Sequence, residues 1–483
     1  MNRVFENTSA LFIAQLIGRI LSFGLMAILM PRYFTEAALG SYITAMSLTN
    51  LIAVLAELGM QSPLIREMTL HRRQARHFLG NALIIRILSS IIAFGLMVGT
   101  GYVIGHLLDL QQNFLRMILL LGLADIINST ALLFRYVFRA FERMGYEALT
   151  VVVERSLVVF VGGVFIGLGM NLVNFCAVVL VASIFNLLLS IGIVARRFIP
   201  LGFHADLGIW KSLMRQALPF AVGNICNLIY FRIDRVLLPI LSPHGVTANA
   251  WYGLAYSLVI AFTILPGAFM GAMFPVMART FVEKRRKFGG IYTDALRWMF
   301  LVGVPFAVGM ATLSEKISYV LFPNYEWTAI APALRLLSWS GGLSFLTTVA
   351  VSVLRVTDKR RAFSIFMGTT AFLNIALNLI LIPRFNHVGA AMAMIISEVY
   401  LFIGSFIYIT LRISKLTYIS FAIKTGIVSA LMGAALMFLR DRFSIWLLIP
   451  CAMIFYLAAM AAVGELRRGI IPKGMELTDE SSF

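Results

Sequence analysis

The stretch LPFAVGNICNLIYFRIDRVLLPIL, residues 218–241, is apolar along most of its length but carries Arg232, Asp234 and Arg235 within four residues. As a helix, its 24 residues would extend about 36 Å, which is enough to cross the ~30 Å hydrocarbon core of a bilayer. Apolar runs of similar length recur along the whole chain. We therefore predict a membrane protein in which one span holds charges that need a partner or a function.

The composition excludes a water-soluble protein. Of the 483 residues, 60% are hydrophobic and 13% are charged, against about 45–50% and about 25% in ordinary soluble domains. The first apolar run, 9–31, is longer than the apolar part of a signal peptide, so we expect a retained membrane helix. The predicted fold is all-α, with about fourteen membrane-spanning helices at 9–31, 37–60, 81–105, 114–138, 148–168, 172–194, 215–241, 247–276, 292–313, 331–354, 363–383, 388–411, 420–439 and 444–464.

Lys and Arg alternate between successive loops. One set of loops is strongly basic and includes REMTLHRRQAR (66–76), RTFVEKRRK (279–287) and RVTDKRR (355–361), whereas the other set is short and nearly neutral. Basic loops stay in the cytoplasm, so we expect both termini to be cytoplasmic. The net charge of +18 thus reflects membrane topology. It predicts contact with anionic membrane lipids and no binding of nucleic acid.

The sequence also repeats itself. FRAFERMGYEAL (138–149) aligns with LRVTDKRRAFSI (354–365), and PLIREMTLHRR (63–73) aligns with PVMARTFVEKRR (275–286), at offsets of 210–216 residues. Parallel repeats of this kind are typical of transporters, which bind substrate between the repeats. We predict an N-terminal six-helix lobe, a C-terminal six-helix lobe, two additional membrane helices and a cytoplasmic tail, at 1–197, 198–415, 416–466 and 467–483 respectively.

The charges of the span 215–241 are costly. Each charge at a helix centre costs about 2.5–3.5 kcal/mol on the insertion scale, which excludes exposure to lipid. Asp234 is two residues from Arg232 and cannot pair squarely with it, so it needs a partner from another helix, a proton or a metal ion. The polar residues of this span share an arc of about 160° on the helix; they are Asn224, Asn227, Arg232, Asp234 and Arg235.

Two interpretations of the charges stay open. They could be ion pairs that lock the helices together, or they could line a polar cavity for an anionic substrate. Arg suits a diphosphate because its planar fork makes two contacts and keeps its charge. On the second interpretation, the substrate-binding candidates are Arg19, Arg232, Arg235, Asn224 and Asn227, and the ion-coupling candidates are Asp234, Asp125, Glu154 and Glu398.

Charges closer to helix ends are expected to extend to the membrane interface. This second group consists of Glu57, Arg86, Arg135, Arg297 and Arg335.

Motifs for chemistry are missing from the sequence. There is no phosphate-binding Gly-x-x-x-x-Gly-Lys-Ser/Thr loop, no metal-ligand cluster and no outer loop long enough for a catalytic domain. We therefore expect no enzyme activity, no metal site and no cofactor other than a coupling H⁺ or Na⁺.

Four segments carry a resemblance to a known family. YFTEAALGSYITAMSLTNLIAVLAELGMQSPLIREM (33–68) resembles the opening of the polysaccharide transport family, and 218–241 resembles its seventh helix, with its polar Asp-Arg step. ISYVLFPNYEWTAIAPALRLLSW (317–339) and 354–365 are similar to its later segments. The resemblance covers nearly the whole chain. By position, it assigns the cationic site to Arg19, Arg232 and Arg235.

The resemblance implies a fourteen-helix, two-lobed exporter of the multidrug/oligosaccharidyl-lipid/polysaccharide superfamily. It would flip an undecaprenyl-diphosphate-linked oligosaccharide, such as an O-antigen unit of lipopolysaccharide, across the bacterial inner membrane. Alternating access and an ion gradient would drive it, and other polysaccharide-assembly proteins are expected partners. A drug or cation antiporter of the same fold is the alternative, but it should lack an arginine cluster. A polysaccharide polymerase or ligase is disfavoured, because it would need a catalytic outer loop.

Overall fold

The computed structural model describes residues 16–110, 112–200, 202 and 205–465, without the side chains of 219, 220, 222 and 224. Within this part of the chain there are helices and no strands. The helices are η1 (Gly24–Leu29), α2 (Met30–Tyr33), α3 (Glu36–Glu57), α4 (Gln61–Leu70), η2 (Arg72–Gln74), α5 (Ala75–Leu107), α6 (Gln112–Ala140), α7 (Met144–Gly167), α8 (Leu172–Arg197), α9 (Leu207–Leu241), α10 (Gly245–Phe262), α11 (Ile264–Glu283), η3 (Arg285–Lys287), α12 (Phe288–Thr312), α13 (Ser314–Leu321), α14 (Trp327–Val356), α15 (Arg360–Arg412), α16 (Ser420–Leu439) and α17 (Ile445–Ala462).

The all-helical membrane class is confirmed. Twelve helical stretches in the described residues are long and apolar enough to cross a membrane. One of them, α15, joins the predicted spans 363–383 and 388–411 across a kink at Asn386 (φ 54°, ψ −136°). Helix α9, which bears the three charges, is not among the twelve. The count of fourteen spans and the cytoplasmic termini stay predictions.

The chain forms two compact units. The first unit contains 1–257 and 375–390, and the second contains 258–374 and 391–483. Helices α9 and most of α10 therefore group with the first unit, and α15 contributes to both. The lobes predicted at 1–197 and 198–415 follow the sequence repeat, a different criterion, and stay a prediction.

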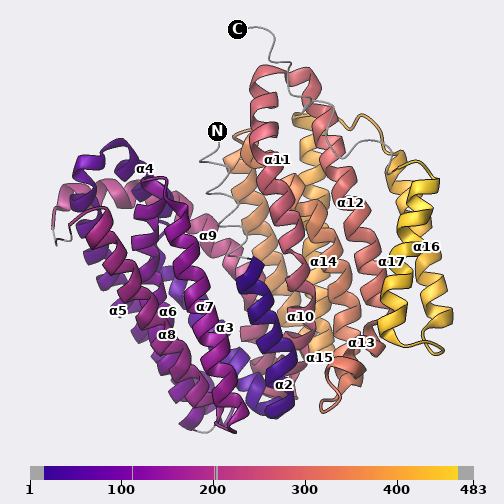
Figure 1. Ribbon diagram of the computed structural model, residues 1–483, viewed down its shortest axis with the longest axis horizontal. Coiled ribbons are helices and arrows are strands. Elements are labelled where there is room, and N and C mark those ends of the chain that lie inside the picture. Colours follow the sequence, from indigo (N-terminus) through magenta and orange to yellow (C-terminus); the bar gives the residue numbers. More distant parts are fainter. Residues whose placement is uncertain (1–15, 111, 201, 203–204, 466–483) are drawn as a thin grey trace. The chain divides into compact units, whose positions relative to one another are not determined.

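In the first unit, α6 packs against α3, α5 and α8, and Figure 1 shows these helices side by side in indigo and purple. The chain leaves α3 through Leu58 and Gly59, both with positive φ (49° and 66°). A Cβ on Gly59 would lie 2.7 Å from the carbonyl oxygen of Ala217 and 2.5 Å from the amide nitrogen of Ala221. Only glycine allows this contact between the turn and the backbone of α9.

In the second unit, α12 packs against α14 and α16, and α16 lies beside α17, the pair coloured yellow in Figure 1. The backbones of α12 and α14 touch: a Cβ on Gly303 would lie 2.7 Å from the carbonyl oxygen of Gly342. The end of the described chain is fastened by a buried ion pair, in which Nε of Arg297 lies 3.1 Å from Oε2 of Glu465. Lys424 of α16 lies 3.1 Å from the same carboxylate and completes the cluster.

The local backbone repeats at the predicted offset. Glu142 and Asp358, 216 residues apart, both have positive φ (58° and 55°) at the turn after a long helix. The following amide closes the turn in the same way: Arg143 donates to the carbonyl of Phe138 at 2.8 Å, and Lys359 donates to that of Leu354 at 2.9 Å. Two basic 3₁₀ turns, η2 and η3, lie 213 residues apart.

In each repeat, a polar side chain also forms hydrogen bonds with the segment that follows the sixth helix of that repeat. The two side chains lie at equivalent positions of α5 and α12. Oδ1 of the fully buried Asn81 accepts from the backbone amide of Asp206 (2.7 Å) and from Nε1 of Trp210 (2.8 Å). Asp294, 213 residues later, accepts from the hydroxyl of Tyr418 at 2.6 Å. We call Asn81 and Asp294 the two clasps. The first clasp sets the entry of α9, which begins at Asp206, whose side chain caps the amides of Gly208 and Ile209.

Candidate functional site

Asp234 and Arg235 of α9 both have bonding partners within the first unit. Asp234 is 1% exposed, and its carboxylate accepts from the hydroxyl of Tyr252 in α10 and from the amide of Arg235 (2.8 Å). Of the three predicted alternatives for Asp234, a partner from another helix, a proton or a metal ion, the structure shows the first, and Tyr252 is that partner. Arg235 donates to the carbonyl of Phe231 at 2.7 Å and stacks on Tyr256, 4.5 Å from the ring centroid.

Arg232 differs from Arg235, although both lie on the same helix. It is partly exposed, and its buried Nη1 has no hydrogen-bond partner among the described residues. Its electrostatic neighbours include Asp125 of α6 and Tyr256 of α10. Of the two predicted arginines of α9, Arg232 is thus the one whose guanidinium is available to a ligand.

Asp125 lies among neutral hydrogen-bonding groups of α3. Nδ2 of Asn50 donates to its Oδ2 at 3.2 Å, and Thr49 lies within hydrogen-bonding reach of the carboxylate. Arg155 and Arg232 are the cations in its electrostatic surroundings, and Glu154 is a nearby acid. Asp125 thus faces two arginines while being bonded to neutral donors.

Arg155 of α7 was not among the predicted site residues, yet the fold brings it to this place. Its guanidinium has no ion pair or hydrogen bond among the described residues, and the residue is exposed. Its stem lies against the helix that carries Arg19: a Cβ on Gly18 would be 3.3 Å from Cγ of Arg155. Arg19 is exposed and has Tyr256 as an electrostatic neighbour. We call Arg19, Arg155, Arg232 and Asp125 the arginine cluster.

Glu154 takes part in a different set of contacts inside the first unit. Its Oε2 lies 3.0 Å from Nη2 of Arg135 in α6 and accepts from Nδ2 of Asn186 in α8 at 3.0 Å. Asn128 continues the network by donating to Ser183 at 3.0 Å. Arg135 was expected to extend to the interface, whereas it pairs with Glu154 between helices. This geometry matches the open interpretation of interhelical ion pairs.

The remaining predicted residues lie elsewhere. Asn227 of α9 is exposed, and the side chain of Asn224 lies outside the described residues. Glu398 is buried in the second unit, next to Ser397, which accepts from Nδ2 of Asn374 at 3.3 Å. The first unit therefore brings together Arg19, Arg232 and Asp125 but not Glu398.

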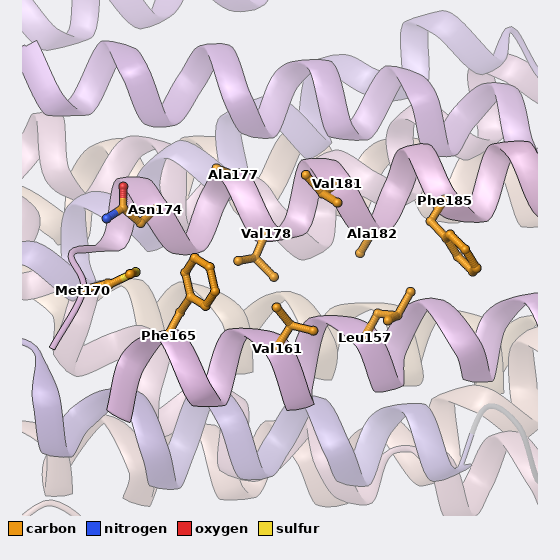
Figure 2. Close-up of a pocket in the computed structure, with 10 residues that line it drawn as sticks. All are labelled: Leu157, Val161, Phe165, Met170, Asn174, Ala177, Val178, Val181, Ala182 and Phe185. Atoms are coloured by element: carbon orange, nitrogen blue, oxygen red, sulfur yellow. The ribbon is translucent and has the colours of Figure 1, made fainter. Parts of the chain in front are cut away.

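An apolar groove of about 530 Å³ lies between α7 and α8, again in the first unit. Figure 2 shows side chains of the two helices facing each other across it, with Asn174 at one end. The lining offers hydrocarbon and a single amide and no cation, so it does not suit a phosphate. Its lining residues are Leu157, Val161, Phe165, Met170, Asn174, Ala177, Val178, Val181, Ala182 and Phe185.

The arginine cluster contains three guanidinium groups and one carboxylate. Arg232 also has Arg235 and Asp234 as electrostatic neighbours, so cations outnumber acids by four to two. This excess favours an anionic ligand, because guanidinium groups at membrane depth form charge-assisted hydrogen bonds with phosphate oxygens. The carboxylate of Asp125 presents oxygen atoms that suit a proton or a small cation. Among the described residues, no group of three or more His, Cys, Asp or Glu side chains gathers at one place.

Two neighbours of the arginine cluster could be identified only from the structure. Asn50 and Tyr256 are neutral residues of apolar helices, and no pattern in the sequence separates them from core residues. Arg155 did carry a signal, since it is a charge in an apolar run.

Comparisons with known proteins identify the family of the chain and proteins with a similar sequence. The sequence model of the family described as "Polysaccharide biosynthesis protein" matches residues 4–281. An uncharacterized membrane protein of Methanocaldococcus jannaschii is 22% identical over 467 residues, which cover 89% of each chain.

Solved structures show the same fold at low identity. The lipid II flippase MurJ, in an inward closed conformation, matches with a TM-score of 0.79 at 15% identity, over 94% of this chain and 99% of that one. An inward-facing multidrug resistance MATE transporter of the MOP superfamily matches with a TM-score of 0.66 at 16% identity, over 83% and 94%. The fold is that of this transporter superfamily, and the chain belongs to the polysaccharide biosynthesis protein family.

Proposed function

We propose that the protein is a flippase that moves a lipid-linked oligosaccharide, joined to its polyprenyl carrier through a diphosphate, across the membrane. The observation that carries the proposal is the pair Arg155 and Arg232, whose guanidinium groups lack ion pairs in the described structure and share Asp125 as an electrostatic neighbour. A cationic pair of this kind at membrane depth calls for an anionic ligand. A diphosphate supplies at least two negative charges in one compact group.

The physical barrier explains why such a protein is needed. A diphosphate and several sugars do not cross ~30 Å of hydrocarbon unaided, whereas the lipid tail can remain in the bilayer. Two alternating states of the protein, each open to one side, are sufficient for exchange. Net transport then needs an ion gradient or removal of the product.

We assign ion coupling to Asp125. Its carboxylate is bonded to neutral donors and faces cations that also serve the substrate, so a proton or Na⁺ there changes the charge of the whole cluster. Asp234 is bonded to Tyr252, and Glu154 is paired with Arg135, which makes both less accessible to an ion. Their coupling roles, and that of Glu398, stay predictions.

Complementation tests the proposal directly. The chain is expressed in bacteria that lack a surface-polysaccharide flippase, and the polymer displayed on the surface is measured. Restoration by the wild type and its loss in Arg232→Gln, at equal amounts of membrane-inserted protein, are expected. This result would also support a location in the inner membrane and cooperation with polysaccharide-assembly proteins.

Failure of complementation needs a second measurement, because the sugar identity of the substrate is not known. Proteoliposomes containing the protein are therefore assayed with a fluorescent undecaprenyl diphosphate and, separately, with a lipophilic organic cation. Movement of the cation without movement of the diphosphate would replace the flippase proposal by a drug/cation antiporter of the same fold.

A further inference from the structure

We infer that Arg155 is a further substrate-contacting residue, and that Asp125 competes with the substrate's diphosphate for Arg155 and Arg232. The inference rests on the proposed function and names a residue that deepens it. In the empty protein, Asp125 neutralises part of the charge of the two arginines. When a cation occupies Asp125, the charge of both guanidinium groups acts on phosphate oxygens without that opposition.

The position of Arg155 supports the first half of this inference. Two elements of the first unit lie near it: the helical segment 16–23 contacts its stem at Gly18, and α6 supplies Asp125 as an electrostatic neighbour. Asp125 has Arg232 of α9 as a second cationic neighbour. Its neighbour Glu154 pairs with Arg135 and accepts a hydrogen bond from Asn186. Arg155 therefore has no ion-pair partner in the described structure. An exposed arginine in an apolar span without such a partner is costly unless a ligand uses it.

The surroundings of Asp125 support the second half. The charged and titratable groups around it are Arg155, Arg232, Glu154 and Tyr42. Of these, the two arginines attract its carboxylate, and Asn50 holds the carboxylate in place at 3.2 Å. A phosphate that binds either arginine is therefore opposed by the negative charge of Asp125, which attracts the same cations. Thermodynamic linkage then requires that a cation on Asp125 and the diphosphate strengthen each other's binding.

Binding measurements in lipid nanodiscs test the inference. The probes are undecaprenyl diphosphate and undecaprenol, which has the same tail without phosphate, and each is titrated with and without Na⁺ at two pH values. We expect Arg155→Gln to weaken binding of the diphosphate about ten- to hundredfold and to leave undecaprenol unchanged. Arg155→Lys should retain part of the affinity, because it keeps the charge but loses the fork.

Asp125→Asn is the second arm. Removing the competing carboxylate should tighten binding of undecaprenyl diphosphate and abolish its dependence on Na⁺ and pH. The matched control is Arg72→Gln, which removes one exposed cation of the same unit, 3.4 Å from Glu142. This control should bind both probes like the wild type.

Each result has a defined meaning. Wild-type protein that binds the diphosphate no better than undecaprenol refutes the proposed function itself. If the wild type binds the diphosphate preferentially, equal affinity in Arg155→Gln, or an equal loss for undecaprenol, refutes the role of Arg155. An unchanged cation dependence in Asp125→Asn refutes the competition. If Arg155→Gln fails to fold, the Arg155→Lys variant is measured in its place. Wild-type affinity of Arg155→Lys for the diphosphate would refute a bidentate contact of Arg155.

Discussion

The two repeats of the chain have the same turns but different interiors. At the 216-residue offset of the turns Glu142 and Asp358, four charged positions of the first repeat meet neutral residues in the second. The pairs are Asp125 with Gly341, Arg135 with Val351, Glu154 with Thr370, and Arg155 with Ala371. The second helical framework thus forms with neutral residues at these four positions. The shared arrangement of helices therefore does not by itself require the four charges.

Gly341 shows what the second repeat does with the position of Asp125. A Cβ there would lie 2.4 Å from Cγ1 of Val259 and 3.3 Å from Phe306, so the helices pack too closely for any side chain. The first repeat keeps an acid and a hydrogen bond at this position, and the second uses it for contact between helices. The following experiments exchange features between the repeats.

The largest effect is expected for Gly341→Asp, which moves the acid into the apolar repeat. Steric overlap costs about 1–3 kcal/mol and the unpaired acid about 2.5–3.5 kcal/mol, so most of the protein should fail to fold. The yield of monodisperse protein after detergent extraction measures this. Gly290→Asp, near the start of α12 where no atom lies within 4 Å of a Cβ, is the control. Equal yields would contradict close packing at Gly341.

A smaller loss is expected when the ion pair of the first repeat is broken. Arg135→Val leaves Glu154 buried without its cation and should cost about 3–5 kcal/mol. The double variant Arg135→Val/Glu154→Thr, which copies the second repeat, should recover most of that stability. Thermal unfolding of the purified protein provides the measurement. A double variant as unstable as Arg135→Val would show that the pair is required for folding of this repeat.

Substitution of the two arginines of α9 should have different effects, one on ligand affinity and the other on stability. Arg232→Gln should lower affinity for a diphosphate lipid about ten- to hundredfold with unchanged thermal stability, because its guanidinium has few partners in the protein. Arg235→Gln should instead cost about 1–3 kcal/mol of stability through the lost stacking on Tyr256 and the lost bond to Phe231. The reverse pattern would exchange their roles.

The smallest effects concern the two clasps. Asn81→Ala leaves the Trp210 indole and the Asp206 amide without their acceptor, at a cost of about 1–2 kcal/mol. Asp294→Ala removes the acceptor of Tyr418 and should cost a similar or smaller amount. Rates of amide hydrogen exchange in the 205–215 and 413–419 segments measure each effect locally. Loss of protection outside the matching segment would argue against local clasps.

The fold could be predicted from the sequence because the bilayer imposes a strong pattern on composition. Apolar runs of about 20 residues gave the helices, and the offset between basic turns gave the repeat. The sequence was less informative where two helices approach each other. Arg86 and Arg297 were expected to extend to the interface, and this was wrong: both are buried, Arg86 bonded to Ser129 at 2.8 Å and Arg297 to Glu465.

The candidate site could be predicted only in part. A charge in an apolar run is visible in the sequence, so Arg19, Arg232 and Asp125 could be named as candidates. Whether such a charge is free depends on its neighbours in three dimensions, and Arg235 and Arg232 have the same sequence signal. Tyr252 donates a hydrogen bond to Asp234, and Arg235 stacks on Tyr256. In the sequence, both tyrosines are ordinary aromatic residues of an apolar helix.

The contact of Gly59 with α9 has a consequence for motion. Helix α9 is held to the first unit by the Gly59 turn at Ala217 and Ala221, and again by Tyr252 at Asp234. Arg232 and Asp125 therefore keep their separation during any displacement of that unit as a rigid body. On the proposed function, opening to one side of the membrane or the other would then change which solution reaches the ligand, while the contacts to its charged end stay constant.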